Sequence, residues 1–180
     1  MRLDHIAYRV SDRLKAVTFF KEAFGYKEQS VFELKFDNGT TCDCTALEPP
    51  EKVENAPWQF FTHDSLMNPT AEYHMAPEIF VSEGQPGSIV EQWIKERNGV
   101  GGIHHLAYQV ASVENTMKEW QEKGYAEFCS EEPLTCPGLT QVFTKPSDLT
   151  GIIYEFITRG EHGFCTENVK SLMESTVIQS

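Results

Sequence analysis

The chain alternates apolar and polar residues over short stretches, the pattern of β-strands, and two of these stretches nearly repeat. His5-Ile-Ala-Tyr-Arg-Val10 and His105-Leu-Ala-Tyr-Gln-Val110 lie 100 positions apart. Each leads into a helix-length stretch, Ser11 to Phe24 and Ser112 to Lys123, that is followed by Gly-Tyr. A unit present twice, with a histidine at the same place in each copy, predicts a pseudo-twofold site where the halves meet.

The elements expected between the two copies complete one βαβββ unit and add a linking helix. The first copy lies in a strand at Arg2–Val10, and the helix after it presents one apolar stripe. An Asp-Asn-Gly sequence between two alternating stretches predicts a hairpin turn. In chain order we expect a helix with the stripe Leu14, Val17, Phe20 and Phe24, strands at Lys27–Phe36, Thr40–Leu47 and Pro77–Ser82, and a helix at Ser88–Asn98.

The second unit repeats this order. Two such units side by side predict an α+β fold, in which an eight-stranded, open barrel-like sheet has helices on its outer face and a concave cleft inside. The expected elements are strands at Gly102–Val110, Ala126–Ser130, Leu139–Lys145 and Gly151–Arg159, a helix marked by Val113, Met117 and Trp120, and a tail helix at Thr166–Met173.

We expect these units to form one domain at residues 1–160, with a first module at 1–98 and a second at 99–160. The tail, 161–180, has room to pack on a partner or across the mouth of the cleft. Residues 51–76 are irregular and rich in aromatic side chains, and this is long for a connection inside a compact domain. A functional loop and a loop that only packs on the surface both remain open for this insertion.

The faces of the repeated strands indicate where their histidines point. Ile6, Tyr8 and Val10 share one face, and the following helix needs this apolar surface to cover. His5 therefore faces the concave side, and the same argument places His105 there. The neighbouring His104 falls on the helix side, where packing or a hydrogen bond accounts for it.

Carboxylates occur in the strands expected beside the histidines. Glu155 interrupts an otherwise apolar strand, and a buried carboxylate requires a cation, a metal or a hydrogen-bond donor. Alignment of the strand ends pairs Glu78 with Glu155 to within one residue. With His5 and His105 these two acids form a ligand set for a divalent ion such as Co, Mn, Fe, Ni or Zn. His74 can replace Glu78, or the position can lack a protein ligand and hold Phe80.

Composition and net charge limit the classes of molecule that the protein is expected to bind. The chain has 180 residues, 40% hydrophobic and 23% charged, which suits one soluble domain. The net charge of −12 comes without a cluster of Lys and Arg, which argues against nucleic acid and anionic membranes but leaves an anionic small molecule open. Five cysteines without zinc-like spacing indicate reduced thiols, and no signal peptide or membrane-spanning run is present, so we expect a cytoplasmic protein.

Over residues 1–50 and 77–159 the doubled βαβββ plan with cleft-facing histidines resembles the vicinal oxygen chelate superfamily. This superfamily includes glyoxalase I, methylmalonyl-CoA epimerase, extradiol-type dioxygenases and drug-resistance proteins. The epimerase branch is most similar, through the helix leading into Gly102-Ile-His-His-Leu-Ala107 and through the stretch from Phe143 to Phe156. The resemblance implies that His5, His105 and Glu155 bind a metal, and that the protein could form a homodimer.

The resemblance also implies two further roles. The fourth metal ligand of the family is a Gln or Glu, and Glu78 fits this place only if the strand register shifts. Epimerases take a carboxylate base from the hairpin region of the first unit, where Asp37 and Glu33 are the candidates, and Glu155 counts among the catalytic residues as well.

Three functions follow as hypotheses. The first is a metal-dependent isomerase, epimerase or lyase that stabilises an enediolate formed from a small 2-oxo or acyl-thioester substrate. The second is an Fe(II) dioxygenase that uses two histidines and one carboxylate. The third is a protein that binds a drug or metabolite without catalysis. In each case Arg9, Gln109, Phe80 and His74 are expected around the small molecule.

Overall fold

The computed structural model describes residues 1–50, 76–159 and 165–176. Its eight strands form one mixed, curled sheet in the order β2-β3-β4-β1-β5-β8-β7-β6, which confirms the predicted α+β fold. The strands are β1 Arg2–Val10, β2 Lys27–Lys35, β3 Thr41–Glu48, β4 Glu78–Gly84, β5 Gly101–Gln109, β6 Leu134–Cys136, β7 Leu139–Phe143 and β8 Ile153–Arg159. The helices are α1 Arg13–Phe24, α2 Ile89–Lys95, α3 Val113–Glu122 and α4 Thr166–Ser175.

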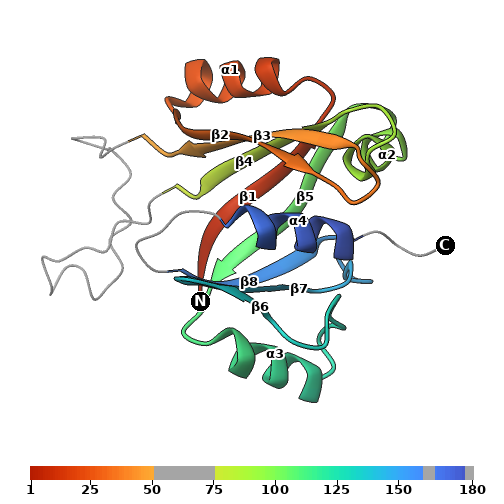
Figure 1. The fold of residues 1–180 in the computed structure, drawn as a ribbon. Helices are drawn as coiled ribbons and strands as arrows, with labels where there is room; N and C mark the ends of the chain where they lie inside the picture. The colour runs from red at the N-terminus through yellow and green to blue at the C-terminus, as the bar shows by residue number, and fades with distance from the viewer. Residues whose placement is uncertain (51–75, 160–164, 177–180) are drawn as a thin grey trace, which may run out of the picture.

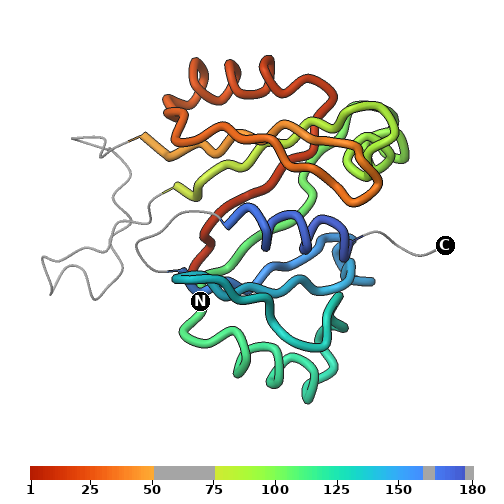
Figure 2. The backbone as a smooth tube through the Cα atoms, viewed as in Figure 1, coloured from red at the N-terminus to blue at the C-terminus, as the bar shows by residue number. Residues whose placement is uncertain are grey.

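The two repeated strands lie next to each other in the middle of the sheet. β1 and β5 pair antiparallel, and each has a parallel partner on its other side, β4 for β1 and β8 for β5. The backbone trace in Figure 2 shows both central strands crossing between the two halves of the molecule. Equivalent positions of the two modules therefore meet at the sheet centre, as the repeat predicts.

Polar caps explain where the first three helices begin. The side chains of Asp12, Ser88 and Ser112 each accept a hydrogen bond from a backbone N–H in the first turn of α1, α2 and α3. At its other end α1 stops at Gly25, which has a φ of 75° and donates its N–H back to a carbonyl of the last turn.

Helices α1 and α3 lie on the outer face of the sheet (Figure 1). α1 packs on the face formed by Ile6, Tyr8 and Val10, as the alternation predicts. α3 buries Val113 and Met117 against its own half of the sheet. The predicted stripe of α1 is partly wrong, because Leu14 and Phe24 are exposed at its two ends. None of the described helices is long and apolar enough to span a bilayer.

The tail helix α4 lies on the concave side, between the two halves of the sheet (Figure 1). Its residues Val169 and Met173 pack against the core cluster of the first module, and Leu172 packs against Phe143 of the second. The helix therefore covers the cleft, which is one of the two places that the sequence leaves open for it.

The strand predicted near residues 126–130 is wrong. Phe128 makes only an isolated bridge to Thr144, and the edge strand of this half is β6. The reason is the turn Pro137-Gly138, in which Gly138 has a φ of 77° and Cys136 pairs directly with the first residue of β7. The closest segment in the chain thus takes the place beside β7.

Candidate metal centre

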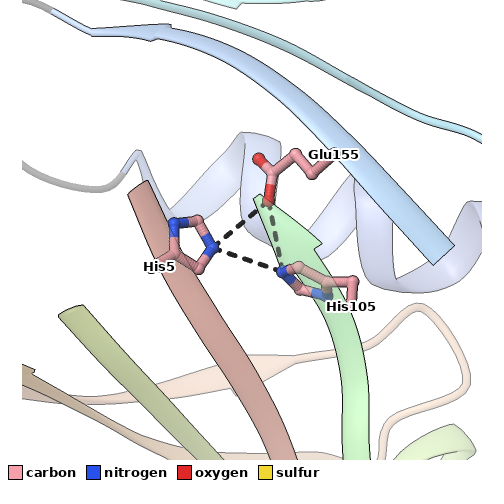
Figure 3. A group of neighbouring side chains, drawn as sticks. All are labelled: His5, His105 and Glu155. Atoms are coloured by element: carbon pink, nitrogen blue, oxygen red, sulfur yellow. Dashed lines mark hydrogen bonds and ion pairs between the residues drawn. The ribbon is translucent and has the colours of Figure 1, made fainter. Parts of the chain in front are cut away.

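Three side chains from three strands converge on the concave face of the sheet. Figure 3 shows His5 of β1, His105 of β5 and Glu155 of β8 pointing toward one another. The Oε2 atom of Glu155 lies 3.2 Å from the Nε2 atom of each histidine. The two Nε2 atoms are 3.3 Å apart. All three residues are buried, with at most 6% of their surface exposed.

The register of the sheet explains why these side chains meet. His5 lies opposite Ala107 in the antiparallel pair, and Glu155 lies opposite the same Ala107 in the parallel pair. His105 lies opposite Ala7. The small side chains of the two alanines leave the space above them free, so the longer neighbours lean together there.

The arrangement fits a divalent metal ion. Two ligand atoms bound at right angles to an ion, each about 2.1 Å from it, are about 3.0 Å apart, close to the separations seen here. Two imidazole nitrogens and one carboxylate oxygen suit Fe, Co, Ni, Mn and Zn. Among the residues that the structure describes, this is the one group of His, Cys, Asp and Glu side chains arranged in this way.

The charges of the three groups differ. Burial alone would raise the pKa of the Glu155 carboxyl, but His5 and His105 outweigh this effect and lower it to about 2. Burial likewise disfavours the charged form of His5, yet the carboxylates of Glu155 and Asp4 raise its pKa to about 9. Burial lowers the pKa of His105, which Glu155 offsets only in part. Without metal, the site therefore holds one imidazolium, one neutral imidazole and one carboxylate near neutral pH.

A chain of polar contacts orients His5. Its Nδ1 atom donates to Asp4 Oδ1 at 2.8 Å, which leaves Nε2 facing Glu155 and the centre of the site. Arg159 donates twice to Asp4, at 2.7 and 3.0 Å, and once to Glu78 at 2.8 Å. Carboxylates that accept from the second nitrogen of a histidine are typical of metal sites, where they fix the orientation of the ring.

A second histidine orients His105. The Nδ1 atoms of His104 and His105 are 2.8 Å apart. When His105 Nε2 faces a metal, its proton lies on Nδ1 and is donated to His104, which then has its own proton on Nε2. That His104 Nε2 atom is buried without a hydrogen-bond partner. The His104 ring packs against Trp93 at 5.4 Å and against Phe143 at 6.3 Å between centroids. The predicted packing or hydrogen-bonding role agrees with these contacts, but the predicted helix side is wrong, because a register shift in β5 brings His104 to the same side as His105.

Phe80 occupies the fourth place around the centre. It lies opposite Ala7 in β4, just as Glu155 lies opposite Ala107 in β8. Glu78 lies two residues earlier, opposite His5, so the register shift that would make it the equivalent of Glu155 does not occur. Its carboxylate accepts from Arg159 instead. The structure thus brings three of the four predicted metal ligands together.

A small cavity lies over the three side chains. Phe80, Gln141 and Phe143 form its walls, and Val169, Leu172 and Met173 of α4 cover it. Its volume of about 20 Å³ has room for an ion or a water molecule but not for an organic substrate. The Gln141 amide is buried, and its nitrogen has no hydrogen-bond partner. Gln141 was missed in the sequence, although it interrupts an apolar strand as Glu155 does.

Comparison with known proteins agrees with this geometry. Residues 4–136 match the family model described as the glyoxalase/bleomycin resistance protein/dioxygenase superfamily. The chain belongs to this superfamily. An ethylmalonyl-CoA/methylmalonyl-CoA epimerase of Cereibacter sphaeroides is 26% identical over 155 residues, which cover 86% of this chain and 95% of the relative.

Two solved structures show how widely this superfamily fold is shared. Methylmalonyl-CoA epimerase from Mycobacterium tuberculosis is 16% identical, with a TM-score of 0.60 and 88% of each chain covered. A variant of 4-hydroxymandelate synthase from Streptomyces coelicolor is 20% identical, with a TM-score of 0.70, over 97% of this chain and 52% of that one. At these identities the likeness concerns the fold.

The remaining predicted residues lie away from His5, His105 and Glu155. Asp37 is at the β2–β3 turn with 83% of its side chain exposed, and Lys170 of α4 donates to it at 2.5 Å. Glu33 is exposed on β2 beside Lys35, at 3.8 Å, whereas the intervening Leu34 is buried in the core. Neither candidate base is brought to the cavity in this arrangement.

Of the residues predicted to contact the substrate, one lines the cavity. Phe80 lines the cavity. Gln109, the last residue of β5, instead accepts a hydrogen bond from Arg2 at 3.2 Å. Arg9 is buried on the concave face, beyond the described cavity. His74 lies outside the described residues.

Proposed function

We propose that this protein is an Fe(II)-dependent oxygenase of the superfamily, with His5, His105 and Glu155 as its protein ligands. The supporting observation is Phe80 at the fourth place, which limits the protein donors to two histidines and one carboxylate. Such a set, with further positions open on the ion, is typical of non-haem Fe(II) oxygenases. His5, His105 and Glu155 would hold the Fe(II), which would supply the activation of dioxygen next to a bound organic substrate.

The other residues around the centre have roles that follow from their contacts. Asp4 and His104 hold the two imidazole rings in orientation. Phe80 and Phe143 exclude water from one side of the ion. The unpartnered amide nitrogen of Gln141 donates to a carbonyl oxygen of the substrate, for which a 2-oxo acid is the simplest class. An organic substrate enters when α4 moves off the cavity.

Oxygen consumption tests this proposal. Protein loaded with one equivalent of Fe(II) without oxygen is mixed with a panel of 2-oxo acids in aerated buffer, and oxygen uptake is followed with an electrode. We expect uptake in step with loss of substrate, none with Zn(II), and none in Glu155→Gln. The exposed Glu127→Gln is the matched control and should retain uptake. Fully loaded protein that consumes no oxygen with any member of the panel would contradict the proposal.

Epimerisation is the second candidate, and the 26% identity to an ethylmalonyl-CoA/methylmalonyl-CoA epimerase over most of both chains favours it. That reaction needs a base beside the substrate carbon. Among the described residues, Glu155 is the one carboxylate that lines the cavity, and it already serves as a ligand, so the geometry supports this candidate less well. Co(II)-loaded protein incubated with methylmalonyl-CoA in deuterium oxide should incorporate deuterium if epimerisation is correct.

A further inference from the structure

Arg9 is a buried cation that has no anionic partner among the described residues. Its side chain is on the concave side of β1, and 3% of the residue is exposed. Within residues 1–50, 76–159 and 165–176 one hydrogen bond holds it, from Nη2 to the hydroxyl of Thr176 at 3.4 Å, and its Nε atom has no partner there. Among the described residues, no carboxylate forms an ion pair with it. Removing a charge from water is unfavourable unless a counter-charge compensates it.

The surroundings of Arg9 compensate its charge only in part. Its guanidinium carbon lies 5.6 Å from the centroid of the Trp93 ring, and the exposed Arg97 stacks on the same ring at 3.8 Å. Burial, with a smaller repulsion from Arg97, lowers the pKa of Arg9 to about 9, although the neighbouring thiols of Cys42 and Cys44 act in the opposite direction. His104 packs on Trp93 too, and its Nε2 atom is the second buried nitrogen here without a partner. Two unpaired donors and an excess of positive charge are what an anionic group would satisfy.

The same helix covers Arg9 and the metal cavity. Thr176 directly follows α4, and its hydroxyl donates to the Met173 carbonyl at 2.8 Å, so its oxygen accepts from Arg9. Met173 lines the cavity and lies one helical turn, about 5 Å, away. Along β1, Arg9 is two residues past Ala7, which pairs with His105, a separation of about 7 Å. A ligand that displaces α4 would therefore contact both places.

We propose that Arg9, with His104 Nε2, forms an anion subsite, and that the substrate has a second carboxylate in addition to the group that binds the metal. In the described arrangement the Thr176 hydroxyl oxygen takes the place of one oxygen of that carboxylate. The substrate class is thus a 2-oxo dicarboxylate rather than a 2-oxo monocarboxylate. The metal-binding half of this statement rests on the proposed function, but the anion subsite does not.

Two acids of equal chain length test the subsite. 2-Oxoglutarate and 2-oxopentanoate share five carbons and the same 2-oxo acid head, and they differ in the distal carboxylate. Titration calorimetry on Zn(II)-loaded protein, which cannot turn over with oxygen, measures both dissociation constants. We expect the dicarboxylate to bind at least tenfold more tightly. In Arg9→Met this ratio should fall to within twofold, with the affinity for 2-oxopentanoate retained, and in Arg9→Lys it should be intermediate.

Arg97→Met is the matched control, because it removes an arginine from the same tryptophan at an exposed position, and it should keep the ratio of the wild type. Equal binding of the two acids by the wild type, or an unchanged ratio in Arg9→Met, would overturn the subsite. Arg9→Met should melt at the same temperature as the wild type or higher, because it loses an unpaired charge. A much lower melting temperature with an unchanged ratio would show that Arg9 only anchors α4.

Failure of the proposed function gives a different result. If neither acid binds the Zn(II)-loaded protein, the 2-oxo acid head is wrong, and the subsite is then tested on metal-free protein with inorganic phosphate at constant ionic strength. A rise in melting temperature in the wild type and Arg97→Met, but not in Arg9→Met, would support the anion subsite by itself. The same response in all three proteins would overturn it.

Discussion

Strands β4 and β8 hold equivalent places in the two modules but differ where the site is built. Each pairs parallel with one of the central strands, and the residue opposite the alanine is Phe80 in β4 and Glu155 in β8. The duplicated backbone therefore offers two pairs of equivalent positions around one point, and side chains at three of these four positions can bind a metal. The backbones of the two modules are symmetric, but the donor atoms are not, because β4 has Phe80 where β8 has Glu155.

The hydrogen-bond partners of the two equivalent histidines also differ between the modules. The ring of His5 donates to the carboxylate of Asp4, whereas the ring of His105 is paired with the neutral His104. The pKa of His5 is raised in consequence, and the pKa of His105 is lowered mainly by burial. One module thus provides a ligand that must lose a proton to bind a metal, and the other provides a ligand that is already neutral.

The largest expected effect comes from the residue that breaks the symmetry. Changes to orienting partners weaken metal binding by about 10–100-fold, so loss of a direct ligand in Glu155→Gln should weaken it by more than about 100-fold. The matched variant is Glu78→Gln, whose carboxylate is linked to the site through Arg159 and Asp4. It should lose about tenfold or less. Competition with a chelating dye measures both, and equal losses would refute the distinction between β4 and β8.

Restoring the symmetry is the next test. Phe80→Glu places a carboxylate opposite Ala7, and this fourth ligand, the second with a negative charge, should tighten binding of Co(II) or Mn(II) by about tenfold. Without metal, the added carboxylate is buried near Glu155, so the melting temperature should fall. The variant should also lose oxygen uptake, because a position needed on the ion is filled. Phe80→Leu, which adds no donor, is the control, and tighter metal binding in that variant would contradict the interpretation.

Much of this site could be predicted from local pattern. Strand alternation alone placed His5 and His105 on the concave side, since an adjacent helix must cover the apolar face. Glu155 was detectable because a charge in an apolar strand requires a partner. The Asp4–Arg159 contact was not, because it joins residues 155 positions apart whose pairing depends on the sheet order. The choice between Glu78 and Phe80 at the fourth place stayed open for a related reason, since aligning strand ends leaves the register uncertain by a residue or two.

A pH titration addresses the difference between the two histidines. In the metal-free protein the pKa of His5 is about 9, above its ordinary value of 6.5. Its contribution to stability is then complete below about pH 6.5 and is lost as the pH rises through about 9. The free energy of unfolding should fall over this range by at most about 1.4 kcal/mol per pH unit. Asp4→Asn should flatten this slope, and denaturant titrations that show the same slope in both proteins would contradict the assignment.

The smallest expected effect concerns Asp37, the candidate base of the epimerase hypothesis. Asp37 is exposed and contacts Lys170 of α4, and exposed ion pairs contribute about 1 kcal/mol or less. Asp37→Asn should therefore change oxygen uptake by about twofold or less, with Lys170→Met as the control for the ion pair. A general base, by contrast, contributes about 10²–10⁴-fold. A loss of that size in deuterium incorporation, in Asp37→Asn but not in Lys170→Met, would identify Asp37 as the base. It would favour epimerisation over oxygenation.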